Sequence, residues 1–191
     1  IALEADRIVA VGPRKEVESN HNSDRVIDAA KNVILPGLID VHGHAGHALV
    51  KTIGHGPTGM WGDIVDYVYA EGTDEEFWYA DALLSSVDRL KNGTTCGVTY
   101  LGGGTMIMRT NKPVYADKHC DAVTQVGIRE FIAVGPSNPP YPRKYVSWSS
   151  GTMESQMVDF DQYLKTSEEI INNWHDKGSG RIQVSIMSPT I

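Results

Sequence analysis

The chain has 191 residues, of which 41% are hydrophobic and 21% are charged, and this composition is typical of a globular protein with a sizeable core. Its net charge of −7 and its isoelectric point near 5.4 argue against nucleic acid and anionic membranes as partners. There is no long apolar run and no leader pattern, and Cys96 and Cys120 form no C-x-x-C pair, so we expect a cytoplasmic protein with reduced thiols.

The first 32 residues read as short strands separated by turns. Residues 8–13 form an apolar run closed by Gly-Pro, and Arg25–Asp28 is a second short run. The polar residues between the two runs are expected to connect them.

The stretch from Val33 to His47, VILPGLIDVHGHAGH, predicts a buried strand over residues 33–42 that ends in histidines. Alternate residues of a strand point to one side about 6.6 Å apart, so His42 and His44 can converge on one ion while Gly43 faces away. Asp40 has the same parity. Two neutral imidazoles are typical zinc ligands, although a lone His-x-His also fits surface histidines, and two ligands do not complete a site.

The connection over residues 45–72 follows the histidine strand. If the fold is a barrel, the loops at the carboxyl ends of strands carry substrate contacts, so His47, His55 and Trp61 are candidates, and ordinary packing is the alternative for each. Glu71 fits either a substrate contact or a solvated residue before a helix.

A helix is predicted next, from the capping box Thr73-x-x-Glu76 to Asn92-Gly93. Its apolar face consists of four residues at helical spacing, Phe77, Ala80, Leu84 and Val87. A strand over residues 94–101 follows. Glycines 102–104 fit a tight exit from that strand; a phosphate-binding G-x-G-x-x-G is excluded because residue 107 is Ile.

The remaining elements continue the alternation. We predict a helix over 115–126, a strand over 128–134, a helix over 154–177 and a strand over 181–187. The proline-rich residues 135–144 indicate an ordered loop or lid, and Arg143, Tyr145 and Trp148 near it are candidate substrate contacts. Alternating strands and helices indicate a parallel sheet, either doubly wound or part of a barrel.

The nine residues Pro36–His44, PGLIDVHGH, resemble the signature P-G-[FL]-[IV]-[DN]-x-H-x-H of the metal-dependent amidohydrolase superfamily, where it forms strand 1 of a (β/α)8 barrel. Asn92-Gly93-Thr94-Thr95 resembles the start of strand 2 in that family. The resemblance extends over nearly all 191 residues and is best to the branch of chlorohydrolases and of guanine, cytosine and S-adenosylhomocysteine deaminases.

The resemblance implies an α/β fold with a partial, TIM-like (β/α)8 barrel of strands 1–4. Residues 1–32 would belong to a small N-terminal β-sandwich and residues 33–191 to the first half of the barrel. A complete barrel has about 250 residues. We therefore expect the chain to be an incomplete part of a larger enzyme that is a homo-oligomer at full length.

For function, the resemblance implies one divalent metal ion, zinc or iron, with His42 and His44 as ligands and the other ligands supplied by later strands. A metal-activated water would attack a carbon–nitrogen bond, other than a peptide bond, of a small-molecule substrate. By itself the chain is expected to bind metal weakly and to be inactive. The alternatives are a dehalogenating chlorohydrolase of the same branch and a non-catalytic half-barrel in a binding or assembly protein.

The resemblance also assigns substrate contacts. Glu71 matches a carboxylate that accepts hydrogen bonds from substrate hydroxyls, and His47 and Trp61 lie in a loop that the family uses for substrate. Thr190 stands where related deaminases carry a histidine, and this departure weakens assignment to the S-adenosylhomocysteine deaminases.

Overall fold

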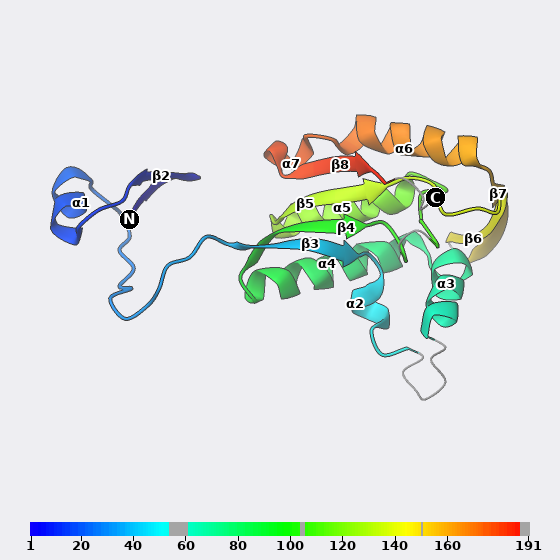
Figure 1. Cartoon of the computed structure of the whole chain (residues 1–191), viewed down its shortest axis with the longest axis horizontal. Helices are drawn as coiled ribbons and strands as arrows, with labels where there is room; N and C mark the ends of the chain where they lie inside the picture. The colour runs from blue at the N-terminus through cyan, green and yellow to red at the C-terminus, as the bar shows by residue number, and fades with distance from the viewer. Residues whose placement is uncertain (54–60, 104–105, 150, 188–191) are drawn as a thin grey trace. The chain divides into compact units, whose positions relative to one another are not determined.

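The computed structural model describes residues 1–53, 61–103, 106–149 and 151–187. The chain divides into two compact units, Ile1–Pro36 and Gly37–Ile191 (Figure 1). The assignment of residues 1–32 to a β-sandwich remains a prediction.

The first unit contains one small hairpin and one short helix. Strand β1 (Ala2–Glu4) pairs antiparallel with β2 (Arg7–Ala10), and α1 follows at Arg14–Asn20. The polar connection predicted after residue 13 is therefore partly helical, with Arg14 and Glu18 paired at the i,i+4 spacing that supports a helix. The strand predicted at Arg25–Asp28 was wrong, because no strand of the described chain supplies it with the ladder hydrogen bonds that a strand requires.

The second unit is built on a four-stranded parallel sheet with the order β3-β4-β5-β8. The bounds of these strands are Leu38–His44, Thr94–Tyr100, Arg129–Val134 and Ile182–Ile186. The crossover helices are α4 (Glu75–Lys91), α5 (Val114–Val126) and α6 (Phe160–Trp174). The predicted strands over 94–101, 128–134 and 181–187 and the helix over 115–126 are confirmed within one or two residues.

The sheet is wound in one direction. Its order in space follows the order in the chain, and right-handed crossovers that always step the same way place their helices on one face. In agreement, α4 packs on α5 and α5 on α6 (Figure 1). A doubly wound sheet reverses its strand order and has helices on both faces, so that alternative was wrong for this sheet.

The two faces of the sheet differ in burial. On the face covered by the helices, Glu130 of β5 is 2% exposed and Ile132 is 1% exposed. On the other face, Ile39 of β3 is 66% exposed and Phe131 of β5 is 45% exposed. One face of this sheet is thus open within the described part of the chain.

The buried strand predicted over residues 33–42 was wrong in two respects. The strand begins only at Leu38, two residues after Pro36, and the apolar residues Val33 to Leu35 lie outside it and are exposed. The apolar side chains of β3 are also exposed, because among the described strands β3 is an edge strand with β4 as its one neighbour, and its other face is open.

A β-bulge interrupts β3 just before the histidines. Asp40 pairs with Gly97 and Gly43 pairs with Thr99, so three steps along β3 oppose two steps along β4. The extra residue shifts the alternation of side chains. Asp40 therefore contacts the helix-covered side, through Arg89 of α4, and the parity predicted for it was wrong.

Helix α4 begins one residue later than the predicted capping box implies. Asp74 is its N-cap and accepts a hydrogen bond from the Phe77 backbone N–H at 2.9 Å, whereas the Thr73 hydroxyl accepts from the Trp78 indole at 3.1 Å.

The face that α4 turns to the core also differs from the prediction. Leu84 and Val87 of the expected apolar face are 38% and 40% exposed. The core-facing side lies about one residue further along the helix and includes a carboxylate, which a count of apolar positions does not register. The buried residues of α4 are Trp78, Asp81, Ala82 and Ser86.

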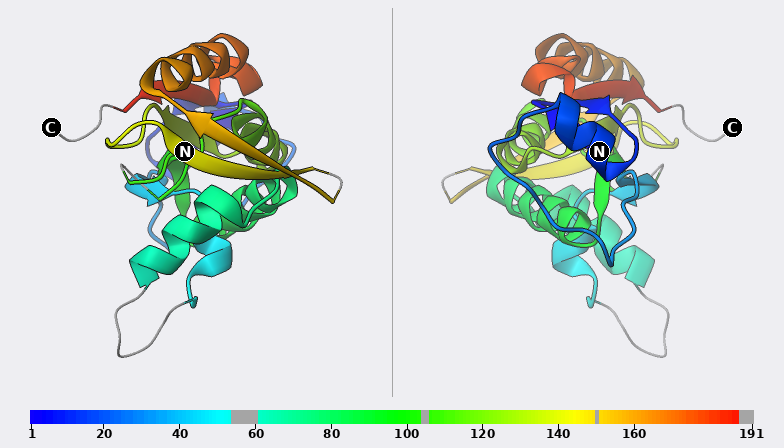
Figure 2. Two further views of the ribbon diagram at one scale, coloured as in Figure 1. Left: turned by 90° about the vertical axis from the view of Figure 1, so that its right-hand side faces the viewer. Right: turned by 90° about the vertical axis from the view of Figure 1, so that its left-hand side faces the viewer.

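A β-hairpin precedes α6 where a longer helix was predicted. Strand β6 (Arg143–Ser149) pairs antiparallel with β7 (Thr152–Val158) and forms a long ribbon (Figure 2). Helix α6 starts only at Phe160, where the Asp159 carboxylate accepts from the Gln162 N–H at 2.8 Å. The helix predicted from residue 154 was thus wrong over its first six residues.

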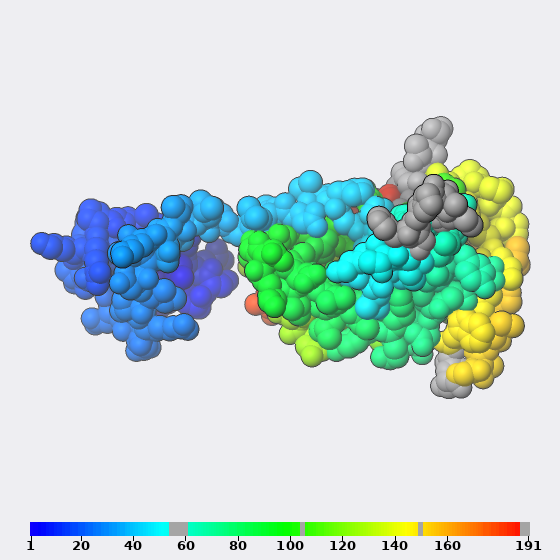
Figure 3. All heavy atoms as spheres, turned by 90° about the horizontal axis from the view of Figure 1, so that it is seen from below, coloured from blue at the N-terminus to red at the C-terminus, as the bar shows by residue number. Residues whose placement is uncertain are grey.

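Three further helices complete the described part of the second unit. They are the short helices α2 (His47–Val50) and α7 (Lys177–Gly180) and the longer α3 (Trp61–Glu71). Helices α2 and α4 pack against each other. The residues that form them, cyan and blue-green, are neighbours on the face shown in Figure 3. Among the described residues, no helix is long and apolar enough to cross a membrane, and both cysteines are free thiols.

Candidate metal centre

The side chains of His42 and His44 meet at the carboxyl end of β3. Their Nε2 atoms are 3.0 Å apart, and their ring centroids are separated by 4.8 Å. The Tyr100 ring, at the end of the neighbouring β4, lies 5.2 Å from one histidine ring and 5.3 Å from the other. The spacing His-x-His therefore does bring both Nε2 atoms to one point.

A backbone carbonyl fixes which nitrogen of His44 carries the proton. Its Nδ1 lies 3.2 Å from the Gly102 carbonyl oxygen, and because a carbonyl only accepts, Nδ1–H donates and the lone pair of the neutral ring lies on Nε2, which faces His42. Burial lowers the pKa of His44, the carbonyl contact raises it, and nearby His42 lowers it; the net direction is down. The imidazole is thereby favoured in the neutral form that a metal ligand requires.

This pair fits a zinc or iron ion. Two nitrogens that each lie about 2.0 to 2.1 Å from one zinc ion are roughly 3 Å apart, which is close to the observed separation of the two Nε2 atoms. A complete site needs more donors, and no group of three or more His, Cys, Asp or Glu is placed to hold an ion within the described ranges. Within the described residues, His42 and His44 could therefore supply two of the ligands that a complete site requires.

His47 extends the cluster away from β3. Its ring lies 4.8 Å from the His44 ring and 4.9 Å from that of Trp61, the first residue of α3. Its Nδ1 is 2.9 Å from the Tyr69 hydroxyl. The pKa of His47 is lowered, mainly by burial and then by His44. Of the expected substrate contacts, His47 therefore lies beside the histidine pair, and Trp61 lies beside His47.

A buried carboxylate holds the turn that carries His47. Asp81 of α4 is fully buried and accepts hydrogen bonds from the backbone N–H of Gly46 at 2.6 Å and of Leu49 at 2.9 Å. Burial raises the pKa of Asp81, although these N–H donors oppose the shift. Gly46 has φ +92°, a conformation that favours glycine, and the Tyr69 ring packs against it.

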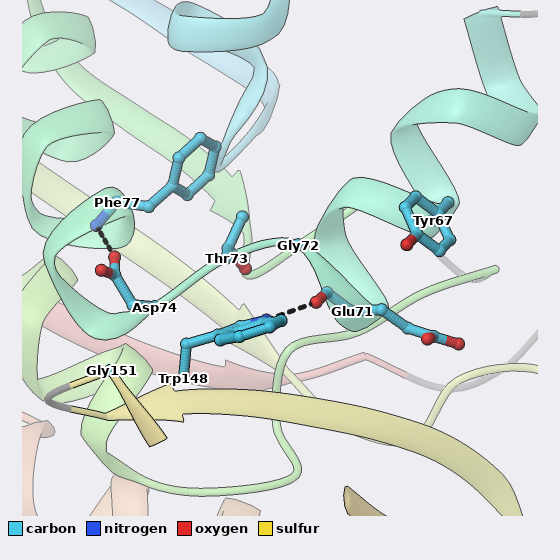
Figure 4. Close-up of a pocket in the computed structure, with 8 residues that line it drawn as sticks. All are labelled: Tyr67, Glu71, Gly72, Thr73, Asp74, Phe77, Trp148 and Gly151. Atoms are coloured by element: carbon cyan, nitrogen blue, oxygen red, sulfur yellow. Dashed lines mark hydrogen bonds between the residues drawn. The ribbon is translucent and has the colours of Figure 1, made fainter. Parts of the chain in front are cut away.

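Glu71 lies in a different pocket. It is the last residue of α3, its carboxylate pairs with Lys144 at 3.2 Å, and its carbonyl accepts from the Trp148 indole at 2.7 Å. Figure 4 shows it in an open pocket of about 560 Å³, whose lining also includes Tyr67, Phe77 and Trp148. None of the described histidines lines this pocket.

The other expected contacts are placed as follows. Trp148 lines the Glu71 pocket, and Arg143 donates to the Asn138 carbonyl at 2.9 Å. Tyr145 is fully buried and its hydroxyl contacts the Met108 carbonyl at 2.8 Å and the Tyr163 hydroxyl at 2.6 Å, so it belongs to the core. His55 and Thr190 lie outside the described residues.

Sequence reasoning missed the groups that support the histidines. Asp81 and Arg89 lie on a predicted helix, Tyr69 lies in the connection over residues 45–72, and the sequence pattern assigns none of the three to the site. One signal in the sequence was available for two of them. Asp81 and Arg89 are charged residues eight positions apart on α4, and Asp81 lies on its buried face, where a charged side chain needs a partner.

Comparisons with known proteins show which proteins the chain is similar to. No family model matches the chain. It is 25% identical over 190 residues to a 5-methylthioadenosine/S-adenosylhomocysteine deaminase of Thermoanaerobacter pseudethanolicus, covering 97% of the chain and 36% of that protein. It is also 25% identical over 174 residues to a 5'-deoxyadenosine deaminase of Methanosphaera stadtmanae, covering 86% of the chain and 33% of that protein.

A solved structure shares the fold. An atrazine chlorohydrolase mutant of Arthrobacter aurescens, complexed with zinc and atraton, matches with a TM-score of 0.55 at 17% identity, over 80% of the chain and 34% of that protein. The chain thus spans about a third of the length of the curated relatives it matches. Over nearly its whole length the chain is thus similar to part of the methylthioadenosine/S-adenosylhomocysteine deaminases, and it shares its fold with part of the chlorohydrolase.

Proposed function

We propose that the protein carrying this chain is a metal-dependent hydrolase acting on carbon–nitrogen bonds other than peptide bonds, with β3, β4, β5 and β8 as the first half of a (β/α)8 barrel. The one-way winding, the helices on a single face and the likeness to the chlorohydrolase support the barrel. The histidines stand at the carboxyl ends of the strands, where barrel enzymes carry their active sites.

The observation that carries the proposal is the convergence of the His42 and His44 Nε2 atoms to 3.0 Å. A bound zinc or iron ion would lower the pKa of a coordinated water towards about 7 and so provide hydroxide at neutral pH. The chain's own contribution is to present two imidazoles with their Nε2 atoms close together. The Gly102 carbonyl orients the His44 ring by holding its Nδ1 proton.

The residues beside the pair suit a planar substrate. The His47 ring lies next to His44 and the Trp61 ring lies next to His47, and Tyr69 fixes His47 through its hydroxyl. We assign to His47 and Trp61 the role of a wall that orients the substrate and excludes water. Glu71 and Thr190 remain predicted substrate contacts that rest on the resemblance alone.

The names of the relatives indicate the first substrates to try. They are deaminases of 5-methylthioadenosine, S-adenosylhomocysteine and 5'-deoxyadenosine, so we propose a small aminated purine nucleoside as substrate. Homo-oligomeric assembly and a cytoplasmic location are further expectations. The 191-residue chain by itself is expected to be inactive, because its described part supplies only two of the ligands.

Ammonia release tests this proposal. The purified protein that carries the chain, loaded with zinc or iron, should release ammonia from 5'-deoxyadenosine or 5-methylthioadenosine, and a His44→Ala change should abolish the release. A His21→Ala change in the first unit is the matched control and should leave the rate unchanged. Absence of turnover on aminated purines, with chloride release from a halogenated triazine, would replace the deaminase assignment by a dehalogenase.

A further inference from the structure

The guanidinium of Arg89 lies against the helix-covered side of the sheet and joins three strands. Its Nε and one terminal nitrogen donate to Asp40 Oδ2 of β3 at 3.1 and 2.9 Å. The other terminal nitrogen donates to the Thr99 hydroxyl of β4 at 3.0 Å and to Glu130 Oε1 of β5 at 3.2 Å. Arg89 comes from the last turn of α4, so one side chain fixes the helix to all three strands.

Two glycines make room for this guanidinium. A Cβ on Gly43 would lie 2.3 Å from a terminal nitrogen of Arg89, and a Cβ on Gly97 would lie 2.8 Å from its central carbon. Gly43 stands between the two histidines. Gly43, the middle residue of the His-x-His motif, is therefore the position where β3 contacts Arg89 on the helix-covered side of the sheet.

Asp40 links the guanidinium to the backbone of a histidine. While its Oδ2 accepts from Arg89, its Oδ1 accepts from the His42 N–H at 3.3 Å. This contact lies across the bulge, where β3 lacks its regular ladder to β4. The Asp40 carboxylate thus supplies a partner to the backbone N–H of His42 in the segment that sets the direction of the histidine ring.

We propose that Arg89 is a positioning residue for the metal centre, acting through Asp40 and the bulge of β3 on the orientation of His42. The inference rests on the proposed function, because the metal ion is what the orientation would serve. Arg89 acts through the strand that carries the imidazoles, by fixing its backbone against α4.

The hydrogen-bonded group around Arg89 also includes a buried pair, Glu130 and His119, to which we assign a role in stability alone. Glu130 Oε2 lies 3.2 Å from His119 Nε2 of α5, and both side chains are almost fully buried, at 2% and 1% exposure. Asp40 is 37% exposed and Arg89 14%. Changes in the buried part should lower stability, whereas changes in the Asp40 part should alter the histidines.

The first test measures the affinity of the protein that carries the chain for zinc, by competition with a chromophoric chelator, and the visible spectrum of its cobalt(II) form. Arg89→Met and Asp40→Ala should each weaken zinc binding by about tenfold or more, as outer-shell changes commonly do, and should alter the cobalt spectrum. Their combination should be little worse than either change alone, since both remove one pathway. Glu130→Gln, the matched control on the same guanidinium, should leave zinc affinity within about twofold.

The second test needs no metal. Hydrogen–deuterium exchange of the metal-free protein should show faster exchange in peptides covering β3 for Asp40→Ala, with β5 unchanged. Arg89→Met also removes the contact with Glu130, so for this variant exchange should accelerate more in β3 than in β5. Equal acceleration of both strands, or none in β3, would overturn the positioning role. If the wild-type protein binds no metal, the proposed function fails, and the exchange pattern still decides the role of Arg89. The positioning role would also be overturned if neither Arg89→Met nor Asp40→Ala changed the zinc affinity or the cobalt spectrum.

Discussion

Gly46 is the backbone position on which the turn between His44 and His47 depends. Its φ of +92° is unfavourable for other residues, and a Cβ there would lie 2.5 Å from Tyr69 Cε1. The Gly46 N–H also donates to the buried Asp81 carboxylate. Conformation and packing therefore require glycine at this residue, and its backbone N–H holds the turn to Asp81.

A Gly46→Ala change should lower the free energy of unfolding by about 2 kcal/mol because of backbone strain and the clash with Tyr69. Gly62→Ala is the matched control: that residue lies in α3 with no described heavy atom near its Cβ position, and alanine should raise stability by up to about 1 kcal/mol. Thermal unfolding of the two variants measures both effects. Equal midpoints would contradict this account of the turn.

Glu130 gives the protein an acid-sensitive component of stability. Burial acts to raise the pKa of this carboxyl, but the charge of His119, its hydrogen bond and Arg89 outweigh burial, and the pKa is lowered. An acid whose folded pKa is below its unfolded value, about 4.3, stabilises the fold above that pH. This stability is lost as the pH falls through the folded pKa.

Glu130→Gln should therefore lower the free energy of unfolding by about 3 kcal/mol at neutral pH, as expected for breaking a buried ion pair. Below a pH of about 4 the difference from the wild type should shrink, because the wild-type carboxyl is then protonated in the unfolded state and increasingly in the folded one. Urea unfolding over a series of pH values measures it. A difference that stays constant from neutral pH down through the folded pKa would show that the carboxylate charge is not the cause.

At the start of helix α4, Asp74 and not the neighbouring Thr73 is the N-cap. Asp74 accepts from the Phe77 N–H, while Thr73 turns inward to bind the Trp78 indole. Glu76 pairs with Lys118 on the surface and does not return to the helix start. The sequence pattern Thr-x-x-Glu is satisfied without forming a capping box.

Asp74→Ala should destabilise the protein by about 1 kcal/mol through loss of the cap. Glu76→Ala, which removes only an exposed pair, should cost at most about 0.5 kcal/mol. Chemical denaturation distinguishes them. If Glu76→Ala lowered the free energy of unfolding more than Asp74→Ala, Glu76 would have to contribute to the helix start, and this account of the cap would be wrong.

Local patterns predicted some elements well and others not at all. Helix α5 and the strands β4, β5 and β8 have clear periodicity, and Gly127 ends α5 in a left-handed conformation as expected. The β6–β7 hairpin was missed because its strands pair with each other over a Gly151 turn and carry few alternating apolar residues. The bulge in β3 was missed because an extra residue leaves no mark in hydrophobic periodicity.

Only those residues of the candidate site that lie close together in the sequence could be predicted. His42 and His44 follow from spacing along one strand, and His47 is three residues further on. Tyr69, Asp81 and Arg89 reach the site from two helices, and only the tertiary fold brings them there. The Arg89 slot between two glycines likewise depends on strand register.

At the scale of the molecule, the open face of the sheet distinguishes this chain from a closed barrel. Cys96 of β4 pairs with Ile39 in the register of that face, whereas Cys120 of α5 is buried and its thiol pKa is raised by burial. A thiol reagent should modify Cys96 of the 191-residue chain much faster than Cys120. In a protein with the complete barrel, Cys96 should be protected, and equal labelling in both proteins would contradict the proposed closure.

The metal content of the purified protein that carries this chain tests the central claim most directly. Elemental mass spectrometry should find close to one zinc or iron per chain in the wild type and in the His21→Ala control, and almost none after a combined His42→Ala and His44→Ala change. This result would establish the half-site on β3 as part of a working metal centre. No metal in the wild type, or full occupancy in the double variant, would contradict it.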